Sequence, residues 1–263
     1  MPRLAALLRP ARTAFALVAL LLAAPAPAEE VDPDIARFVA ANTLWTLFHE
    51  LGHGFVSIYD LPVVGREEDA VDQLATLVML TLYGDDPDTR DLVSDAAYGW
   101  LLAAAQAEEM DDTAFWGAHA LDVQRFTAMV CLLAGADEEA FAEVVELSEI
   151  PEDEVARCID EYEVVARSWD RLLEPHRGAG GPGRLIPRYE ASDSPAVAGF
   201  VAALRESGFD DLLAEIGQSY RLPYNIAVTF ADCGEENAFW DPEAREITIC
   251  HEMIEGLAAL ASE

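Results

Sequence analysis

The segment from His49 to His53 reads His-Glu-Leu-Gly-His and has the residue types of a metal site. Side chains four residues apart on a helix project from one face, so the two imidazoles can bind one metal ion together. Glu50 lies beside them and can act as a general base toward a water molecule on that ion. The motif therefore predicts a Zn²⁺ site with hydrolytic chemistry.

Two histidines leave such a site incomplete, because a catalytic zinc has three protein ligands and one open position. Glu68 is the best candidate for the third ligand, at the start of a predicted second helix. Asp72 lies on the same face of that helix, where it could orient a ligand histidine. Glu67 and Asp69 are expected to face elsewhere. The alternative is an ordinary acidic helix N-terminus, which the helix dipole favours.

The helix that carries the motif is predicted over Pro33–Ser57, because its apolar residues recur at helical spacing. Asp32 before the proline is a typical start signal. Gly52 and Gly54 are poor helix formers, so their presence inside this helix indicates close packing near the site. Further helices are predicted over residues 66–82, 89–106, 122–133, 138–147, 152–173 and, as one long helix, 194–220.

The C-terminal part changes character. The runs Asn225–Phe230 and Ile247–Ile249 are rich in β-formers and have turn-like residues between them. They predict a β-hairpin or a pair of sheet strands, followed by a short helix over 252–261. The fold class is therefore mainly α (α+β), a helical domain with a small β-hairpin or sheet near the C-terminus. The glycine run Gly178–Gly183 predicts a flexible loop over 177–184, which could be a flap beside the cleft.

Residues 1–28 have the pattern of a secretory signal peptide. Three arginines precede the apolar run Ala14–Ala24, and Ala26-Pro27-Ala28 predicts cleavage after Ala28. The alternative is an uncleaved anchor, although the apolar run is short for a membrane span. Residues 29–263 are then expected to form a single domain, secreted or periplasmic, with no membrane span after signal removal.

The net charge of −33 disfavours nucleic acid and anionic membranes as partners. A solvated acidic face is the simplest interpretation, and attraction of a basic substrate is the alternative. The four cysteines, an even number in an exported protein, predict disulfides. Of the three possible pairings, local pairing of Cys131 with Cys158 and of Cys233 with Cys250 is expected.

Glu68-Asp69-Ala70-Val71-Asp72 follows the His-Glu-x-x-His helix as a Glu-x-x-x-Asp segment. The combination resembles the glutamate-zincin (gluzincin) peptidases. The stretch from Leu61 to Asp72 is also similar to a family of secreted, uncharacterised bacterial proteins that are assigned as zinc metallopeptidases, over nearly the whole exported chain. The resemblance implies zinc as cofactor and a peptide or protein as substrate.

Glu236-Asn237-Ala238-Phe239-Trp240 resembles an Asn-Ala-aromatic element of thermolysin-like and neprilysin-like peptidases. There it belongs to an edge strand that holds the substrate backbone, which implies substrate contacts for Asn237 and Ala238. A plain turn with a buried aromatic pair is the alternative. In those families this strand precedes the zinc helix, whereas here it follows, so a real match would mean a rearranged order, as in a circular permutation.

His119 and Arg125 stand six residues apart, as in a similar neprilysin-type segment. The resemblance implies that His119 stabilises the oxyanion of the transition state and that Arg125 binds a substrate carbonyl. Leu121 replaces the proline of that family. The alternatives are a structural histidine and an arginine held in an ion pair.

A zinc-bearing binding or assembly protein of the cell envelope with an idle site is the rival class. Glu50 disfavours it, because zinc binding does not need this residue whereas hydrolysis does. His251 has no second histidine at the spacing of a zinc motif and is expected to be an ordinary strand-end residue. The tryptophans at positions 45, 100, 116 and 169 are assigned to the core.

Overall fold

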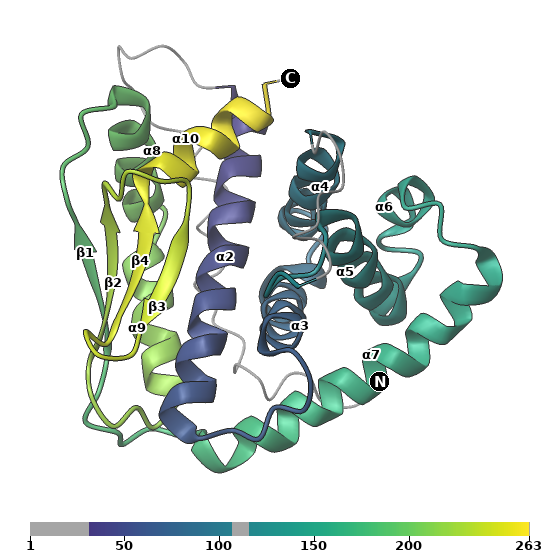
Figure 1. Ribbon diagram of the computed structural model, residues 1–263, viewed down its shortest axis with the longest axis horizontal. Coiled ribbons are helices and arrows are strands. Elements are labelled where there is room, and N and C mark those ends of the chain that lie inside the picture. Colours follow the sequence, from purple (N-terminus) through teal and green to yellow (C-terminus); the bar gives the residue numbers. More distant parts are fainter. Residues whose placement is uncertain (1–31, 107–115, 263) are drawn as a thin grey trace.

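The computed structural model describes residues 32–106 and 116–262 (Figure 1). The predicted signal peptide lies outside the described residues. The helices are α2 (Pro33–Tyr59), α3 (Glu67–Met79), α4 (Asp91–Gln106), α5 (Asp122–Asp137), α6 (Ala142–Leu147), α7 (Glu152–Leu173), α8 (Pro195–Glu206), α9 (Phe209–Ser219) and α10 (His251–Leu260). The strands are β1 (Leu185–Tyr189), β2 (Ile226–Ala231), β3 (Ala238–Asp241) and β4 (Glu246–Cys250). The predicted fold class, mainly α with a small sheet near the C-terminus, is confirmed.

Helix α2 is the central element of the fold. Figure 1 shows it between the sheet on one side and α3 and α4 on the other, and it is apolar and buried over most of its circumference. Its N-terminus is capped by the Asp32 side chain, which accepts a hydrogen bond of 2.9 Å from the Asp34 backbone. A Cβ added at Gly52 would lie 2.9 Å from Cβ of Val71, so glycine lets α3 approach closely there. The predicted close packing is confirmed at this position.

The four strands are ordered β1-β2-β4-β3, and β3 is an edge strand beside α2. The predicted strands β2 and β4 are confirmed as a pair of sheet strands, but they are parallel neighbours and do not form a hairpin with each other. β3 lies between them in sequence and pairs antiparallel with β4. β1, which the sequence did not predict, extends the sheet in parallel beside β2.

Three sequence expectations are wrong. The single helix over 194–220 is two helices, α8 and α9, because Gly208 adopts a left-handed φ of 97° between them. The glycine run does not form a flap over the cavity described below, because none of residues 178–183 lines that cavity and Gly178 and Gly183 donate hydrogen bonds to the carbonyls of Ser219 and Leu222. Trp116 is not a core residue, because 69% of it is exposed.

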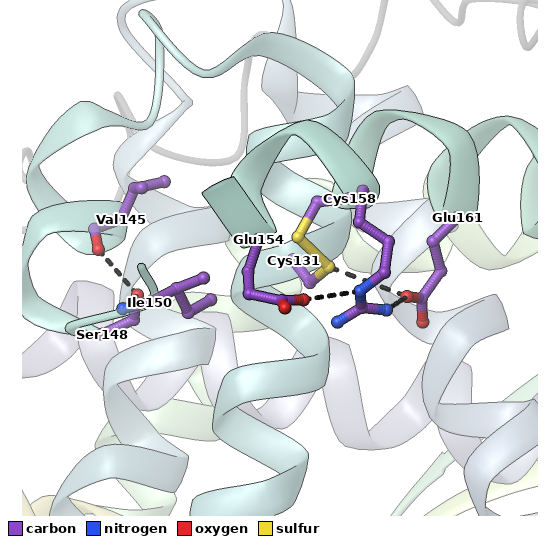
Figure 2. The surroundings of a disulfide bond; sticks show 8 residues. Cys131, Val145, Ser148, Ile150, Glu154, Cys158 and Glu161 are labelled. Carbon is purple, nitrogen blue, oxygen red and sulfur yellow. Dashed lines mark hydrogen bonds and ion pairs between the residues drawn. A yellow bond between two sulfur atoms is a disulfide. The ribbon is translucent and has the colours of Figure 1, made fainter. Parts of the chain in front are cut away.

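Two disulfides link segments that are close in sequence, with the predicted pairing. Cys131–Cys158 joins α5 to α7 (Figure 2), and Cys233–Cys250 joins the loop before β3 to the end of β4. Both covalent links stabilise the fold by restricting the unfolded chain. Among residues 32–106 and 116–262, no helix combines the length and hydropathy that crossing a membrane requires.

Candidate metal centre

Helices α2 and α3 bring together three potential metal ligands. The Nε2 atoms of His49 and His53 are 3.2 Å apart, and each lies 3.3 Å from Oε2 of Glu68. Tetrahedral zinc with bonds of about 2.0–2.1 Å requires donor atoms roughly 3.3–3.4 Å apart. The donor set therefore fits one tetrahedral ion, whose fourth position would face away from these three residues.

A carboxylate holds the second nitrogen of each histidine. Nδ1 of His49 lies 2.6 Å from Oδ1 of Asp72, and Nδ1 of His53 lies 2.8 Å from Oε1 of Glu67. These contacts fix the rings so that both Nε2 atoms point toward Glu68. The expectation that Glu67 faces elsewhere is wrong, because it lies in the first turn of α3, where its side chain can reach back to α2.

Arg125 extends the hydrogen-bond network of His49 beyond Asp72. It donates to both oxygens of Asp72, from Nε at 2.7 Å and from Nη2 at 2.6 Å. Its guanidinium lies 3.6 Å from the ring centre of Trp100 and also faces Trp45. This bidentate, charge-assisted contact and the aromatic surroundings fix Asp72, and through it His49.

Two further side chains reach the donor atoms. Nε2 of His119 lies 2.9 Å from Oε2 of Glu68, while the His119 side chain remains 54% exposed. The Glu50 carboxylate is buried 4.0 Å from Nε2 of His49 and accepts a hydrogen bond from the backbone N–H of Trp240. Glu50 is thus beside the three donors without being one of them.

The three donor residues line a cavity of about 690 Å³ between α2, α4, β3 and α10. Asn237 accepts a backbone hydrogen bond from Cys250, so the backbone groups of Asn237 face β4 and those of Ala238 and Trp240 face the opposite side. On that opposite side, the backbone N–H of Trp240 donates a hydrogen bond to the Glu50 carboxylate, and the backbone N–H of Ala238 donates to Oδ1 of Asn237. The Ala238 carbonyl faces the free edge of the sheet, where an extended chain could pair with it.

Comparison with known proteins places this chain in a family. Residues 19–173 and 189–263 match a family described as "Putative metallopeptidase". The chain belongs to this metallopeptidase family. No curated protein and no solved structure matches the chain. Family membership supports a peptidase-like function that uses a metal ion and acts on peptides or proteins.

The charges of this metallopeptidase site favour protonated histidines when no metal is bound. Burial alone would lower the pKa of His53, but its contacts with Glu68 and Glu67 outweigh burial and raise it to about 9. Burial also opposes charge on His49, yet Asp72 and Glu68 raise its pKa. The hydrogen bonds from His119, His49 and His53 hold the pKa of Glu68 well below its usual range. Burial raises the pKa of Glu50, as suits a group that accepts a proton.

The structure brings all the predicted site residues of this metallopeptidase to one place. The sequence did not predict the contact of Glu67 with His53 or that of the Trp240 backbone N–H with Glu50. Both contacts depend on how α3 and β3 pack against α2. Asp72 contacts His49 and Arg125. The other predicted site residues line the cavity, namely His49, Glu50, His53, Glu68, His119, Arg125, Asn237 and Ala238.

Proposed function

We propose that the protein is a zinc peptidase of the gluzincin type in which His49, His53 and Glu68 hold Zn²⁺. The observation that carries this proposal is the triangle of donor atoms, with sides of 3.2–3.3 Å. Its size suits zinc, and a carboxylate contact on Nδ1 of each histidine leaves Nε2 for the metal. Two imidazoles with one carboxylate are also the donor types of catalytic zinc sites.

Glu50 is proposed as the general base. Bound Zn²⁺ supplies acidification of a water molecule and polarisation of the substrate carbonyl. Glu50 lies beside the metal donors, and the Trp240 N–H fixes its orientation. Its pKa, raised by burial, brings it closer to the pKa of the groups with which it exchanges a proton. Glu50 accepts the proton from the attacking water and delivers it to the leaving amine.

The edge strand β3 is proposed to hold the substrate. An extended peptide can pair with the free edge at Ala238, whose carbonyl would accept a hydrogen bond from a substrate N–H. Asn237 lines the cavity and is exposed, so its amide can add a contact to the peptide backbone. The order of strand and zinc helix along the chain is reversed relative to thermolysin-like enzymes, as a circular permutation would produce.

His119 is proposed as the stabiliser of the oxyanion. It is half-exposed, lines the cavity and lies 2.9 Å from the donor oxygen of Glu68. It could instead join His49 and Glu68 as a ligand, because the three donor atoms lie within 4.8 Å of one another. The ligand set with His53 is preferred because Glu67 holds the His53 ring with Nε2 toward the other two donors.

Arg125 is proposed as a positioning residue. The resemblance to neprilysin-type segments implies that it binds substrate, and it does line the cavity. However, its Nε and Nη2 are both used by Asp72, and its guanidinium packs against Trp100. These contacts support a role that acts through Asp72 on His49. A secreted or periplasmic location is proposed from the two disulfides, which are typical of oxidising compartments.

Metal content and peptide hydrolysis test the proposed function against the rival, an idle zinc-binding protein of the envelope. We expect one zinc per chain in the wild type and in Glu50→Gln, and cleavage of a diverse peptide library by the wild type alone. Glu235→Gln is a matched control, because Glu235 does not line the cavity. A wild type that binds one zinc and cleaves no peptide would favour the rival. Unchanged zinc content in His49→Ala would refute the site.

A further inference from the structure

Glu236 is a carboxylate of the cavity that the proposed mechanism does not use. Among the described residues, four carboxylates line the cavity: Glu50, Glu67, Glu68 and Glu236. Glu50 accepts a hydrogen bond from the backbone N–H of Trp240, whereas Glu67 and Glu68 both contact His53. Within the part of the chain that the structure describes, no hydrogen bond or ion pair involves the Glu236 side chain. An exposed acid is ordinary in so acidic a chain, so its surroundings must decide whether it has a role.

The loop that carries Glu236 is held to α10 and β4 by several contacts. Cys233 is bonded to Cys250, and the backbone N–H groups of Cys233 and Gly234 donate to the Glu252 carboxylate at 3.0 and 2.6 Å. Asp232 contacts Nδ1 of the buried His251 at 2.7 Å. A carboxylate on a loop fixed in this way loses little conformational freedom when it binds a ligand.

The Glu236 carboxylate also lies directly against the backbone of α10. A Cβ at Gly256 would overlap with it, so the absence of a side chain at 256 leaves the space that the carboxylate occupies. Met253 and Leu257, on the same helix, line the cavity with apolar surface. A fixed negative charge beside apolar surface suits a lysine or arginine side chain, whose apolar stem and cationic end need both.

We propose that Glu236 binds a cationic group of the substrate and thereby selects peptides that carry a positive charge near the cleaved bond. This inference rests on the proposed function. Trp240, which bonds Glu50, follows Glu236 by four residues, and a strand rises about 3.3 Å per residue, so the two lie on the order of 10 Å apart. The charge would therefore lie roughly two to four residues from the cleaved bond.

A peptide series tests this proposal. Each peptide carries lysine, arginine or the neutral norleucine at one position, scanned over four residues on each side of the cleaved bond. Each is made with a free and with an acetylated N-terminus. The measured quantity is the ratio of kcat/KM for the lysine peptide to that for the norleucine peptide. We expect a ratio of about 10 or more at one position, as for a hydrogen bond to a charged group.

Variants then assign the preference to Glu236. Glu236→Gln should bring the ratio close to one, and Glu236→Lys should invert it in favour of an acidic residue. Gly256→Ala, which fills the space of the carboxylate, should reduce it. Glu235→Gln removes the same charge from a neighbour outside the cavity, and should keep the wild-type ratio. A lysine-to-norleucine ratio that persists after acetylation shows that the bound cation is the side chain and not the N-terminal ammonium group.

Two results would overturn the proposal: a wild-type ratio near one at every position, or a ratio that survives in Glu236→Gln. A ratio that falls equally in Glu235→Gln would show only a general effect of net charge, and would overturn it as well. Because the proposed peptidase activity could itself fail, the same peptides are also titrated calorimetrically into zinc-loaded Glu50→Gln protein. A lysine preference in affinity that depends on Glu236 supports the cation site even if no peptide is cleaved.

Discussion

The two carboxylates behind the histidines should contribute very differently to zinc affinity. Asp72 holds His49 and is itself held by Arg125, with only 16% of its side chain exposed. Glu67 holds His53, and 46% of its side chain is exposed. A contact shielded from water orients a ligand more strongly than an exposed one, which solvent screens. Asp72→Asn should therefore weaken zinc binding about 10–100-fold, and Glu67→Gln by less than about 10-fold.

The assay is competition for Zn²⁺ with a chromophoric chelator, at one pH and one salt concentration for all variants. Asp72→Asn also leaves Arg125, whose side chain is only 9% exposed, without its partner, which can cost about 3–5 kcal/mol of stability. The double variant Asp72→Asn, Arg125→Met removes that unpaired charge. Its zinc affinity should stay low although its stability recovers. Equal losses in Asp72→Asn and Glu67→Gln, or full zinc affinity in the double variant, would show that shielding of Asp72 from water does not determine zinc affinity.

Four further predictions concern proton release, pH-dependent stability, the packing of Gly52 and the remote disulfide. Zinc binding to the metal-free protein at pH 7 should release protons, because the pKa of His53 is raised to about 9; binding enthalpies that do not vary with the ionisation enthalpy of the buffer would contradict this. In the metal-free protein, the stability contributed by protonated His53 should be fully present below pH 6.5, the ordinary histidine value, and be lost as pH rises through about 9; denaturant unfolding across this range measures it. Gly52→Ala should cost about 1–3 kcal/mol and reduce zinc content, because its Cβ would lie 2.9 Å from Val71. Gly54→Ala is the control with its nearest neighbour at 3.8 Å, and equal effects in the two variants would show that the α2–α3 contact is not limiting. Replacing Cys131 and Cys158 by alanine should lower stability by about 2–4 kcal/mol in urea and leave zinc content unchanged; a loss of zinc would show that this disulfide also shapes the site.

The helix that carries the His-Glu-x-x-His motif and the candidate zinc ligands could be predicted from sequence because their geometry is local. Spacing along one helix places His49 and His53 together, and one turn of the next helix separates Glu68 from Asp72. The single assumption beyond this local geometry is that α3 packs against α2 near Gly52. The predicted disulfides are local in the same sense, since each closes a short segment of the chain.

What the sequence could not indicate depends on contacts between distant segments. The ion pair of Arg125 with Asp72 joins α5 to α3. An arginine that binds substrate would look the same in the sequence, so the sequence alone could not decide between the two roles. The parallel pairing of β2 with β4 depends on β3 taking the edge position, which no turn signal reveals. Gly208 ends a helix only because its backbone is left-handed, a state that glycine permits but does not require.

X-ray absorption at the zinc edge of the zinc-loaded protein identifies the atoms bound to the metal. We expect two imidazole ligands with nitrogen atoms at about 2.0–2.1 Å, together with oxygen ligands at about 2.0–2.2 Å. His53→Ala should remove one of the two imidazole signals, and Glu68→Ala should leave both. A sulfur ligand at about 2.3 Å, or two imidazole signals that persist in His53→Ala, would contradict the proposed zinc site.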